Sequence, residues 1–440
     1  MKVSKYNILT EINGDAPVYV YNTLTNDIKK ICGHCVKEHY AILSDAGRQV
    51  IDDEFIDAYR GFLVENSEDE DVIISRQINS EFGKEKELYL TIVPTNECNF
   101  RCVYCYQRDE SPKSMSDVTQ QEIIRHVSQV IDQYSGLMIG WFGGEPTLCD
   151  KIVTRLSKAF SAICLLKHKY YMAGMTTNGY LLNLDCVKRW YRLGIKSYQI
   201  TIDGPEQIHD QQRIRKNGEG TFRQIVQNLI SIRDGFAEKD FGILIRTNIT
   251  ALLEEHFEQY VDLLYHLFGN DSRFHFHFTK AYDWGGERID SFRDNLLHSS
   301  NLSSYIKIAF NKGLNIDKNL NNIKALGSVC YAARKGQYVI NYDGILSKCT
   351  LGIYDEANHI GKLSSKGNVF FDQRKVDLFT QVHLEEKCKE CRYLPLCMGC
   401  ACPYKNYRDN KTVCPNLFDI LKDLLPILYE RNLAYDLQKK

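Results

Sequence analysis

The sequence lacks the features of a nucleic-acid-binding, membrane-spanning or exported protein. Its formal net charge is only −1 over 440 residues, so no general attraction to nucleic acid or to an anionic membrane is expected. No segment approaches the roughly 18 apolar residues of a membrane span, and residues 1–10 contain no long apolar run of the signal-peptide type. These absences predict a cytoplasmic protein that has neither nucleic acid nor membrane as a partner.

Cysteine, by contrast, is abundant. The chain has 16 cysteines, which would suggest disulfide bonds in a short secreted protein. In a long chain without an export signal they favour metal or redox chemistry instead. Most of them fall into a group at 98–105 and a set spread over 330–414, a distribution that disulfide bonds would not require.

The length of the chain predicts two or three domains. Residues 1–86 are expected to form a small α+β domain, because the alternating residues 17–21 indicate a hairpin and helical patches follow up to Leu63. The acidic stretch Glu65–Asp71 is expected to be a solvated loop or linker. From about residue 326 to the end, cysteine, glycine and a hairpin signal at 338–345 dominate, and 416–431 has the pattern of an amphipathic helix.

Residues 87–325 alternate between strand and helix patterns. Six β–α units in succession imply parallel strands with right-handed crossovers. Because a full barrel needs eight units, the expected fold is α/β, an incomplete parallel (β/α)6 barrel of the TIM type, with its active site at the carboxyl ends of the strands. The predicted strands are 88–94, 137–142, 170–176, 197–202, 242–249 and 274–278, and the predicted helices are 119–134, 152–164, 184–193, 221–233 and 256–268.

Three cysteines follow the first of these strands. Cys98, Cys102 and Cys105 have the spacing C-x3-C-x2-C, so their thiolates can converge on one metal centre. A zinc ion would need a fourth ligand, and none lies nearby in the sequence. A 4Fe–4S cluster with three protein thiolates and one open iron fits better. The alternative is a zinc site completed by a distant residue.

This spacing, with an aromatic residue before the last cysteine, resembles the signature of the radical S-adenosylmethionine (SAM) superfamily. Tyr104 occupies the aromatic position. The resemblance implies that the open iron binds the methionine part of SAM and that reductive cleavage gives a 5′-deoxyadenosyl radical. In such enzymes the protein positions the cofactor and excludes side reactions.

Further motifs agree with the resemblance, and each lies at the predicted carboxyl end of a strand. The sequence W-F-G-G-E-P ends the second strand, T-N-G follows the third, and T-I-D-G ends the fourth. Glu145 is expected to accept a hydrogen bond from the ammonium group of SAM, and Arg213 resembles a family arginine that pairs with the SAM carboxylate. The positions implied to bind SAM are Tyr104, Gly143, Gly144, Glu145, Thr177, Asn178, Thr201, Asp203 and Arg213.

The cysteines after residue 326 form a second pattern. Cys330 and Cys349 precede a C-x2-C-x5-C run at 388–397, and Cys414 follows it. The pattern resembles the SPASM extension of radical SAM enzymes, which carries two auxiliary 4Fe–4S clusters and is typical of members that modify peptides and proteins. The resemblance implies one auxiliary cluster on Cys330, Cys349 and Cys402, and the other on Cys388, Cys391, Cys397 and Cys414.

One ligand position departs from the family pattern. The family usually has a cysteine four positions after the run, where this chain has Ala401. Cys402, which Pro403 follows as in the family, is favoured as the ligand, and Cys400 is its rival. The first auxiliary cluster then keeps an open iron unless Cys400 fills it. A pair of zinc knuckles is the alternative, since C-x2-C is a common zinc spacing.

A further C-x2-C lies near the start of the chain, at Cys32 and Cys35. No partner pair is near it in the sequence. Two reduced thiols are the simpler interpretation, and a metal or redox role is the alternative.

The motifs together predict an enzyme that modifies a ribosomally synthesised peptide. The leading reaction is a thioether crosslink, in which a substrate carbon radical is quenched by a cysteine sulfur. The alternatives are oxidation of cysteine or serine to formylglycine, as in anaerobic sulfatase maturases, a carbon–carbon crosslink or an epimerisation, and a non-catalytic cysteine-stabilised peptide-binding protein. Residues 1–86 resemble the small winged-helix-like domains with which peptide maturases hold a leader peptide. The resemblance implies two partners: the precursor peptide, with its leader bound by strand addition to this domain, and an external electron donor such as flavodoxin or ferredoxin.

Overall fold

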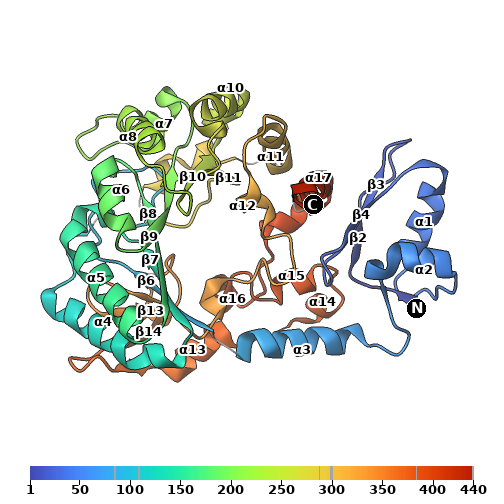
Figure 1. Cartoon of the computed structure of the whole chain (residues 1–440), viewed down its shortest axis with the longest axis horizontal. Coiled ribbons are helices and arrows are strands. Elements are labelled where there is room, and N and C mark those ends of the chain that lie inside the picture. The colour runs from blue at the N-terminus through green and yellow to red at the C-terminus, as the bar shows by residue number, and fades with distance from the viewer. Residues whose placement is uncertain (84–85, 108–109, 287, 298–300, 383, 439–440) are drawn as a thin grey trace. The chain divides into compact units, whose positions relative to one another are not determined.

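The computed structural model of the chain describes residues 1–83, 86–107, 110–286, 288–297, 301–382 and 384–438 (Figure 1). They form two compact units. The first unit combines residues 1–84 with 320–333 and 380–440, and the second comprises 85–319 and 334–379. Each unit thus contains residues from more than one of the predicted domains, 1–86, 87–325 and 326–440. The predicted domains divide the chain by expected function, and this division stays a prediction.

A ten-stranded sheet is the framework of the second unit, in the order β11-β10-β9-β8-β7-β6-β12-β13-β14-β15. Six consecutive strands pair in parallel, and all six predicted strands are among them. The parallel α/β core is therefore confirmed, whereas its curvature into an incomplete barrel stays a prediction. These strands are β6 (Glu87–Ile92), β7 (Gly136–Trp141), β8 (Tyr170–Thr177), β9 (Ile195–Thr201), β10 (Gly242–Ile249) and β11 (Phe274–Lys280).

The predicted helices between the strands are also confirmed, and α4, α5 and α6 lie along one side of the sheet (Figure 1). Ser116 begins the first of them by accepting a hydrogen bond from Thr119 N at 3.1 Å, as a helix N-cap does. Along α5 the buried residues Val153, Leu156 and Phe160 recur at helical spacing, so one face packs on the sheet. The helices are α4 (Asp117–Val130), α5 (Asp150–Leu166), α6 (Leu184–Tyr191), α7 (Glu206–Gln212), α8 (Phe222–Gly235), α9 (Ala251–Glu254), α10 (Phe257–Leu264), α11 (Leu302–Asn311) and α12 (Asp317–Leu320).

Four shorter strands extend the sheet beyond β6. The strand β12 (Gln337–Ile340) pairs in parallel with β6 and antiparallel with β13 (Ile345–Ser347), which confirms the predicted hairpin at 338–345. The strands β14 (His359–Leu363) and β15 (Val369–Phe371) continue the antiparallel order, and α13 (Gln373–Thr380) follows.

The first unit contains a three-stranded antiparallel sheet of β2 (Asn7–Leu9), β3 (Val18–Asn22) and β4 (Ile28–Ile31). The hairpin predicted at 17–21 is therefore confirmed. Apolar residues of the sheet pack with those of α1 (Val36–Leu43) and α2 (Asp53–Tyr59) in one buried cluster. A two-stranded sheet of β1 (Lys2–Val3) and β5 (Leu63–Val64) accompanies them.

The prediction of a solvated stretch over Glu65–Asp71 is wrong at its end. The helix α3 (Glu70–Gly83) begins there, and the carboxylate of Glu70 is buried. It accepts hydrogen bonds from Ser4 Oγ at 2.5 Å and from Lys5 N at 3.0 Å. A carboxylate can be buried where hydrogen bonds replace its water, and these donors lie too far away in the sequence for a local charge pattern to reveal them.

The rest of the first unit comes from the end of the chain. A second buried cluster joins Tyr6, Leu24 and Ile74 with Leu394 and Met398. The predicted terminal helix is confirmed as α17 (Leu421–Gln438), which packs against β3 and β4. The shorter helices of this region are α14 (Glu386–Lys389), α15 (Leu394–Cys397) and α16 (Pro403–Asp409).

Candidate active site

A cavity of about 430 Å³ lies in the second unit, among the loops that follow the parallel strands. All but one of the twelve site residues predicted for this unit's parallel strands line it, and the exception is Asp203. The lining members of that set are Cys98, Cys102, Cys105, Tyr104, Gly143, Gly144, Glu145, Thr177, Asn178, Thr201 and Arg213. The structure therefore brings together residues from the ends of four different strands, β6 to β9.

The loop after β6 supplies the three thiols. Cys102 is buried, whereas Cys98 and Cys105 are partly exposed. Burial raises the pKa of Cys102 to about 11 and also raises that of Cys98, and the nearby thiols add to both shifts. Within the described part of the chain, no three His, Cys, Asp or Glu side chains gather as the ligands of a single metal ion would. A four-iron cluster binds each thiolate through a different iron, so its ligands need not converge on one point.

The loop after β7 and the cysteine loop approach each other so closely that Gly143 and Gly144 leave no room for a side chain. A Cβ atom at Gly144 would overlap the carbonyl group of Glu97, and one at Gly143 would lie 2.7 Å from Thr95 O. Gly143 also has φ of +127°, which favours glycine. The hydrogen bond from Gly144 N to Thr95 O, 3.0 Å long, closes this contact. Both glycines thus hold the loop after β7 against the cysteine loop, where they line the cavity.

Glu145 joins the ends of β7 and β8. Its Oε1 accepts hydrogen bonds from Thr147 N at 3.0 Å, from Thr147 Oγ1 at 2.7 Å and from Thr177 Oγ1 at 2.6 Å, and its Oε2 accepts one from Asn178 N at 2.7 Å. Burial raises the pKa of Glu145, and these hydrogen bonds oppose the shift. Oε2 has the smaller number of donors, so it is the oxygen with capacity for a ligand's ammonium group.

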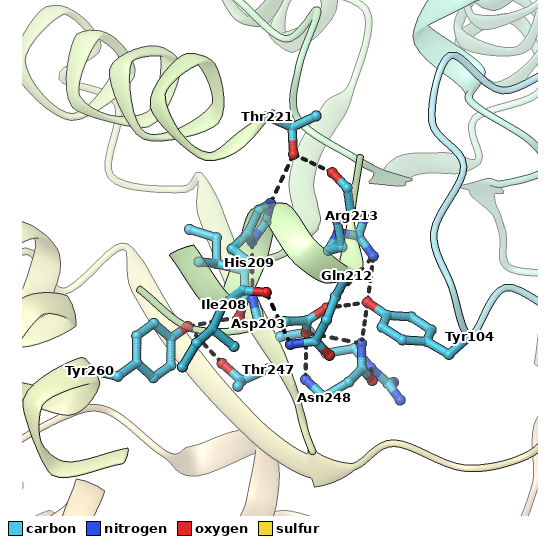
Figure 2. A network of polar contacts seen from close by, with 12 residues as sticks. Tyr104, Asp203, Ile208, His209, Gln212, Arg213, Thr221, Thr247, Asn248 and Tyr260 are labelled. Carbon is cyan, nitrogen blue, oxygen red and sulfur yellow. Dashed lines mark hydrogen bonds and ion pairs between the residues drawn. The ribbon is translucent and has the colours of Figure 1, made fainter. Parts of the chain in front are cut away.

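Asp203 does not line the cavity, but it contacts residues that do (Figure 2). The hydroxyl group of Tyr104 donates a hydrogen bond to Asp203 Oδ2, and Asn248 N donates one to Oδ1 at 2.7 Å. Arg213 Nη1 donates to the Tyr104 hydroxyl at 2.8 Å and lies 4.0 Å from Asp203 Oδ2. Asp203 therefore links the cysteine loop to β10 and to the arginine.

Arg213 combines burial with an unused donor. Burial works against its charge, but Cys102, Tyr104 and Asp203 together raise its pKa well above the usual value. Its Nε has no hydrogen-bond partner among the described residues, although the residue is only 8% exposed. A buried donor of this kind is costly unless it binds something, and its charge favours an anionic group such as a carboxylate.

A second layer holds Arg213 in place. His209 Nδ1 accepts a hydrogen bond from Asp203 N at 3.2 Å, so its Nε2 carries the proton and donates to Thr221 Oγ1 at 3.0 Å (Figure 2). Thr221 Oγ1 in turn donates to Arg213 O at 2.6 Å. Burial lowers the pKa of His209 well below its usual value, which agrees with the neutral ring that this chain of bonds requires.

The cavity lining also includes polar residues of the strands that were not predicted from the sequence, among them Gln199 on β9 and Arg246 and Asn248 on β10. Arg246 donates through Nε to Asn248 Oδ1 at 3.1 Å, and burial lowers its pKa. Side chains alternate between the two faces of a strand, so Arg246 and Asn248 share a face. That alternation within a predicted strand was the signal that could have identified them.

Four of the predicted cluster ligands come together in the first unit. Burial and the proximity of the neighbouring thiols raise the pKa values of three of them, that of Cys397 to about 12, and Cys414 contributes to each shift. Burial alone raises the pKa of Cys400 to about 11. The interacting set is Cys388, Cys391, Cys397 and Cys414. These are the residues assigned to one auxiliary cluster, and the cluster itself stays a prediction.

The other predicted auxiliary ligands are divided between the units. Cys330 and Cys402 belong to the first unit and Cys349 to the second. Within the first unit, Cys330 N donates a hydrogen bond to Cys400 O at 2.9 Å. This backbone contact brings both rivals, Cys400 and Cys402, into the neighbourhood of Cys330, and the choice between them stays a prediction.

Residues 92–264 match the family model described as the radical SAM superfamily. This chain carries a radical SAM domain. The matched residues include the three cysteines, the glycine loop after β7 and the network around Asp203, so the radical SAM domain contains most of the cavity.

Two curated relatives extend the comparison. The GTP 3',8-cyclase of Haemophilus influenzae (strain 86-028NP) is 32% identical over 132 residues, which cover 29% of this chain and 37% of the cyclase. This chain thus spans little more than a third of that relative. The cysteine-type anaerobic sulfatase-maturating enzyme of Clostridium novyi (strain NT) is 24% identical over 349 residues, or 72% of this chain and 88% of the enzyme.

Solved structures show the same fold. The native enzyme anSMEcpe with bound AdoMet and Cp18Cys peptide matches with a TM-score of 0.59 at 18% identity, over 80% of this chain and all of that one. Streptococcus suis SuiB bound to precursor peptide SuiA matches with a TM-score of 0.51 at 13% identity, over 90% and 94% of the two chains. No helix in the described ranges has the length and hydropathy that crossing a membrane demands.

Proposed function

We propose that this protein is a radical SAM maturase that modifies a ribosomally synthesised peptide. The observation that carries the proposal is the single cavity of about 430 Å³ in which three cysteine thiols meet Glu145 and Arg213. A binding module has no need of three thiols beside a buried carboxylate and a buried guanidinium. The sulfatase-maturating relative, which this chain spans to 88% of its length, supports a substrate that is a peptide or protein.

The residues present fit a three-thiolate 4Fe–4S cluster and SAM. Cys98, Cys102 and Cys105 would hold the cluster, which together with SAM supplies a carbon-centred radical that abstracts hydrogen. Glu145 Oε2 would accept the ammonium group of SAM, and the unpartnered Nε of Arg213 would donate to its carboxylate. Tyr104, held through its hydroxyl group by Asp203, fixes the cysteine loop against β9 and β10.

We propose a thioether crosslink as the reaction. The predicted cluster of Cys330, Cys349 and Cys402 has three thiolate ligands, so one iron could bind the thiolate of a substrate cysteine. A bound sulfur close to the substrate radical would favour formation of a sulfur–carbon bond. The electron released would leave through the auxiliary clusters, and a flavodoxin or ferredoxin would supply the electron that starts each turnover.

Oxidation of a cysteine or serine to formylglycine is the second candidate. The coverage of the Clostridium novyi enzyme supports it, and so does the shared fold of anSMEcpe, whose structure holds a Cp18Cys peptide. In this reaction the auxiliary clusters serve only as an electron path, so no open iron is required.

We propose that the first unit binds the leader segment of the peptide. In the three-stranded sheet, β2 and β4 each pair with β3 and with no other strand of the described residues, so each has an edge that can accept an added strand. The precursor peptide held by SuiB supports a peptide partner. Hydrogen–deuterium exchange with a leader peptide should protect one of these two edges.

The test of the function is anaerobic incubation of the reconstituted enzyme with SAM, a reductant and cysteine-containing peptides encoded by neighbouring genes. The enzyme should hold about twelve irons, in three clusters of four. Mass spectrometry should show a peptide that has lost two hydrogen atoms and kept its sulfur if a thioether forms, whereas formylglycine formation from cysteine removes the sulfur.

Alanine variants of Cys98, Cys102 and Cys105 provide the control. They should lose about four irons and all SAM cleavage, and the interacting set of four cysteines in the first unit should keep its cluster. Stoichiometric zinc with little iron in the wild-type protein would contradict the whole proposal.

A further inference from the structure

The pair Cys32 and Cys35 is assigned to none of the predicted clusters. It lies in the first unit, between the end of β4 at Ile31 and the start of α1 at Val36. Gly33 has φ of +78°, which lets the chain turn sharply, and a 3-10 turn over Gly33–Cys35 leads directly into α1. The two thiols thus occupy a strand-to-helix turn.

The two thiols differ in exposure. Cys32 is exposed and is the N-cap residue that precedes the 3-10 turn, whereas Cys35 is partly buried. The thiol of Cys35 donates a hydrogen bond to the carbonyl oxygen of Cys32, with Sγ 3.4 Å from that oxygen, so it points back toward its partner. Thiol–disulfide exchange needs an accessible thiol that attacks first and a nearby second thiol that resolves the mixed disulfide.

Other uses of the pair have less support. A metal ion would need further ligands, and in the portion of the chain that the structure describes no three His, Cys, Asp or Glu side chains are placed to hold one. Packing does not account for the pair either, because Cys32 is exposed, unlike the buried Cys149 and Cys164. The arrangement is that of a dithiol open to solvent on one side.

The position of the pair indicates which kind of molecule would contact the two thiols. Cys32 directly follows β4, which among the described strands pairs with β3 alone and so has a second edge without a paired strand. A peptide that added a strand to this edge would pass beside Cys32. A precursor peptide destined for sulfur–carbon bond formation must present its cysteine as a free thiol.

We propose that Cys32 and Cys35 form a redox-active dithiol that reduces a disulfide on the cysteine-containing peptide substrate. The Cys32 thiolate attacks the peptide disulfide, so one S–S bond breaks, a mixed disulfide forms and the first thiol leaves with a proton. Cys35 then attacks Cys32, which releases the peptide thiol and leaves an intramolecular disulfide. Two electrons pass to the peptide disulfide, and a cellular low-molecular-weight or protein dithiol returns them. The choice of peptide rests on the proposed function, but the redox couple does not.

The first experiment measures the couple itself. The intact holoenzyme is equilibrated anaerobically in dithiothreitol buffers of graded redox ratio, quenched, alkylated and digested with trypsin. Because Lys30 and Lys37 flank the pair, digestion releases residues 31–37, which contain these two cysteines and no others. We expect a single two-electron transition from the dialkylated peptide to the internal disulfide. A peptide that stays dialkylated in every buffer overturns the proposal.

The second experiment measures the exchange. The probe is a synthetic peptide whose single cysteine carries glutathione as a mixed disulfide. Cys35→Ser should accumulate a covalent adduct at Cys32, and Cys32→Ser should release the peptide thiol more than ~10-fold more slowly than wild type. Cys186→Ser, which changes a partly buried thiol elsewhere, is the matched control and should react at the wild-type rate. An unchanged rate in Cys32→Ser contradicts the proposal.

SAM cleavage by the same preparations separates the two proposals. If the couple and the exchange are absent while SAM cleavage persists, only the dithiol assignment fails. If both are present while the wild-type protein cleaves no SAM and binds no cluster, the proposed function fails and the redox site remains.

Discussion

At the scale of single residues, Asp203 decides the geometry of the cavity without lining it. Its side chain is fully buried, and burial raises the pKa of its carboxyl group while Arg213 and the hydrogen bonds from Tyr104 and Asn248 oppose the shift. Each of these contacts joins a different element to the end of β9. Asp203 is thus a positioning residue, which acts on a ligand through Tyr104 and Arg213.

Asp203→Asn should weaken SAM binding while leaving the iron content unchanged. The amide nitrogen of asparagine cannot accept the hydrogen bond from Tyr104, and hydrogen bonds to charged groups contribute roughly 1.5–3 kcal/mol, so the SAM dissociation constant should rise by about tenfold or more. Equilibrium binding under anaerobic conditions measures this. Tyr104→Phe should add little to the effect of Asp203→Asn, because both remove one contact.

Asp240→Asn is the matched control for this substitution. Asp240 forms an exposed ion pair with Lys196, and such pairs contribute only about 0–1 kcal/mol. SAM affinity should therefore stay at the wild-type value. Equal losses in the two variants would mean that the Asp203 network does not position the site.

At the scale of elements, the beginning and the end of the chain form one folding unit. Ile74 on α3 and Tyr6 before β2 pack in the same buried cluster as Leu394 and Met398, and Cys388 and Cys391 belong to or border this cluster. The N-terminal elements therefore support the four-cysteine set and do more than offer a docking surface.

Deletion of residues 1–83 should remove about four irons, those of the interacting set of four cysteines, in addition to any leader binding. The deletion would expose the apolar faces of α14 and α15. The loss of these buried apolar contacts destabilises a small unit. Iron analysis and the spectrum of the purified variant test this. A truncated protein with the full iron content would show that the C-terminal segment folds alone, and the exposed substitution Ile51→Ala should change neither value.

At the scale of the whole molecule, buried neutral histidines make stability depend on pH. Burial lowers the pKa values of His126 and His209 from the usual 6.5. His126 lies between Tyr338 and Gly367 O, with contacts of 2.6 and 3.1 Å. Below pH 6.5 the unfolded chain binds protons at these residues and the folded protein does not, so acid favours unfolding.

The midpoint temperature of unfolding should therefore fall as pH is lowered below 6.5. His126→Asn should lower the midpoint at every pH, but the variant should show a shallower dependence on pH, because one buried neutral imidazole has been removed. Calorimetry across the pH series measures both slopes. A variant as steep as wild type would assign the dependence to other groups, and the exposed His34→Asn should leave the slope unchanged.

The sequence by itself determined the α/β core and most of the candidate site. Buried residues recur every two positions in a strand and every 3.6 positions in a helix, so the local sequence pattern predicts each element. The spacing of Cys98, Cys102 and Cys105 confines three thiols to one loop, and the glycine and polar motifs follow directly after strands whose carboxyl ends meet at one edge of a parallel sheet.

Only the tertiary structure decided which distant residues contact each other. The contact between Tyr104 and Asp203 joins positions 99 residues apart, and the burial of Glu70 depends on Ser4 and Lys5, 65 or more residues away. The union of residues 1–84 with 380–440 is of the same kind. Local sequence patterns predict which face of a helix or strand is apolar. They do not predict which distant element packs on that face. For this reason the two compact units could not be predicted.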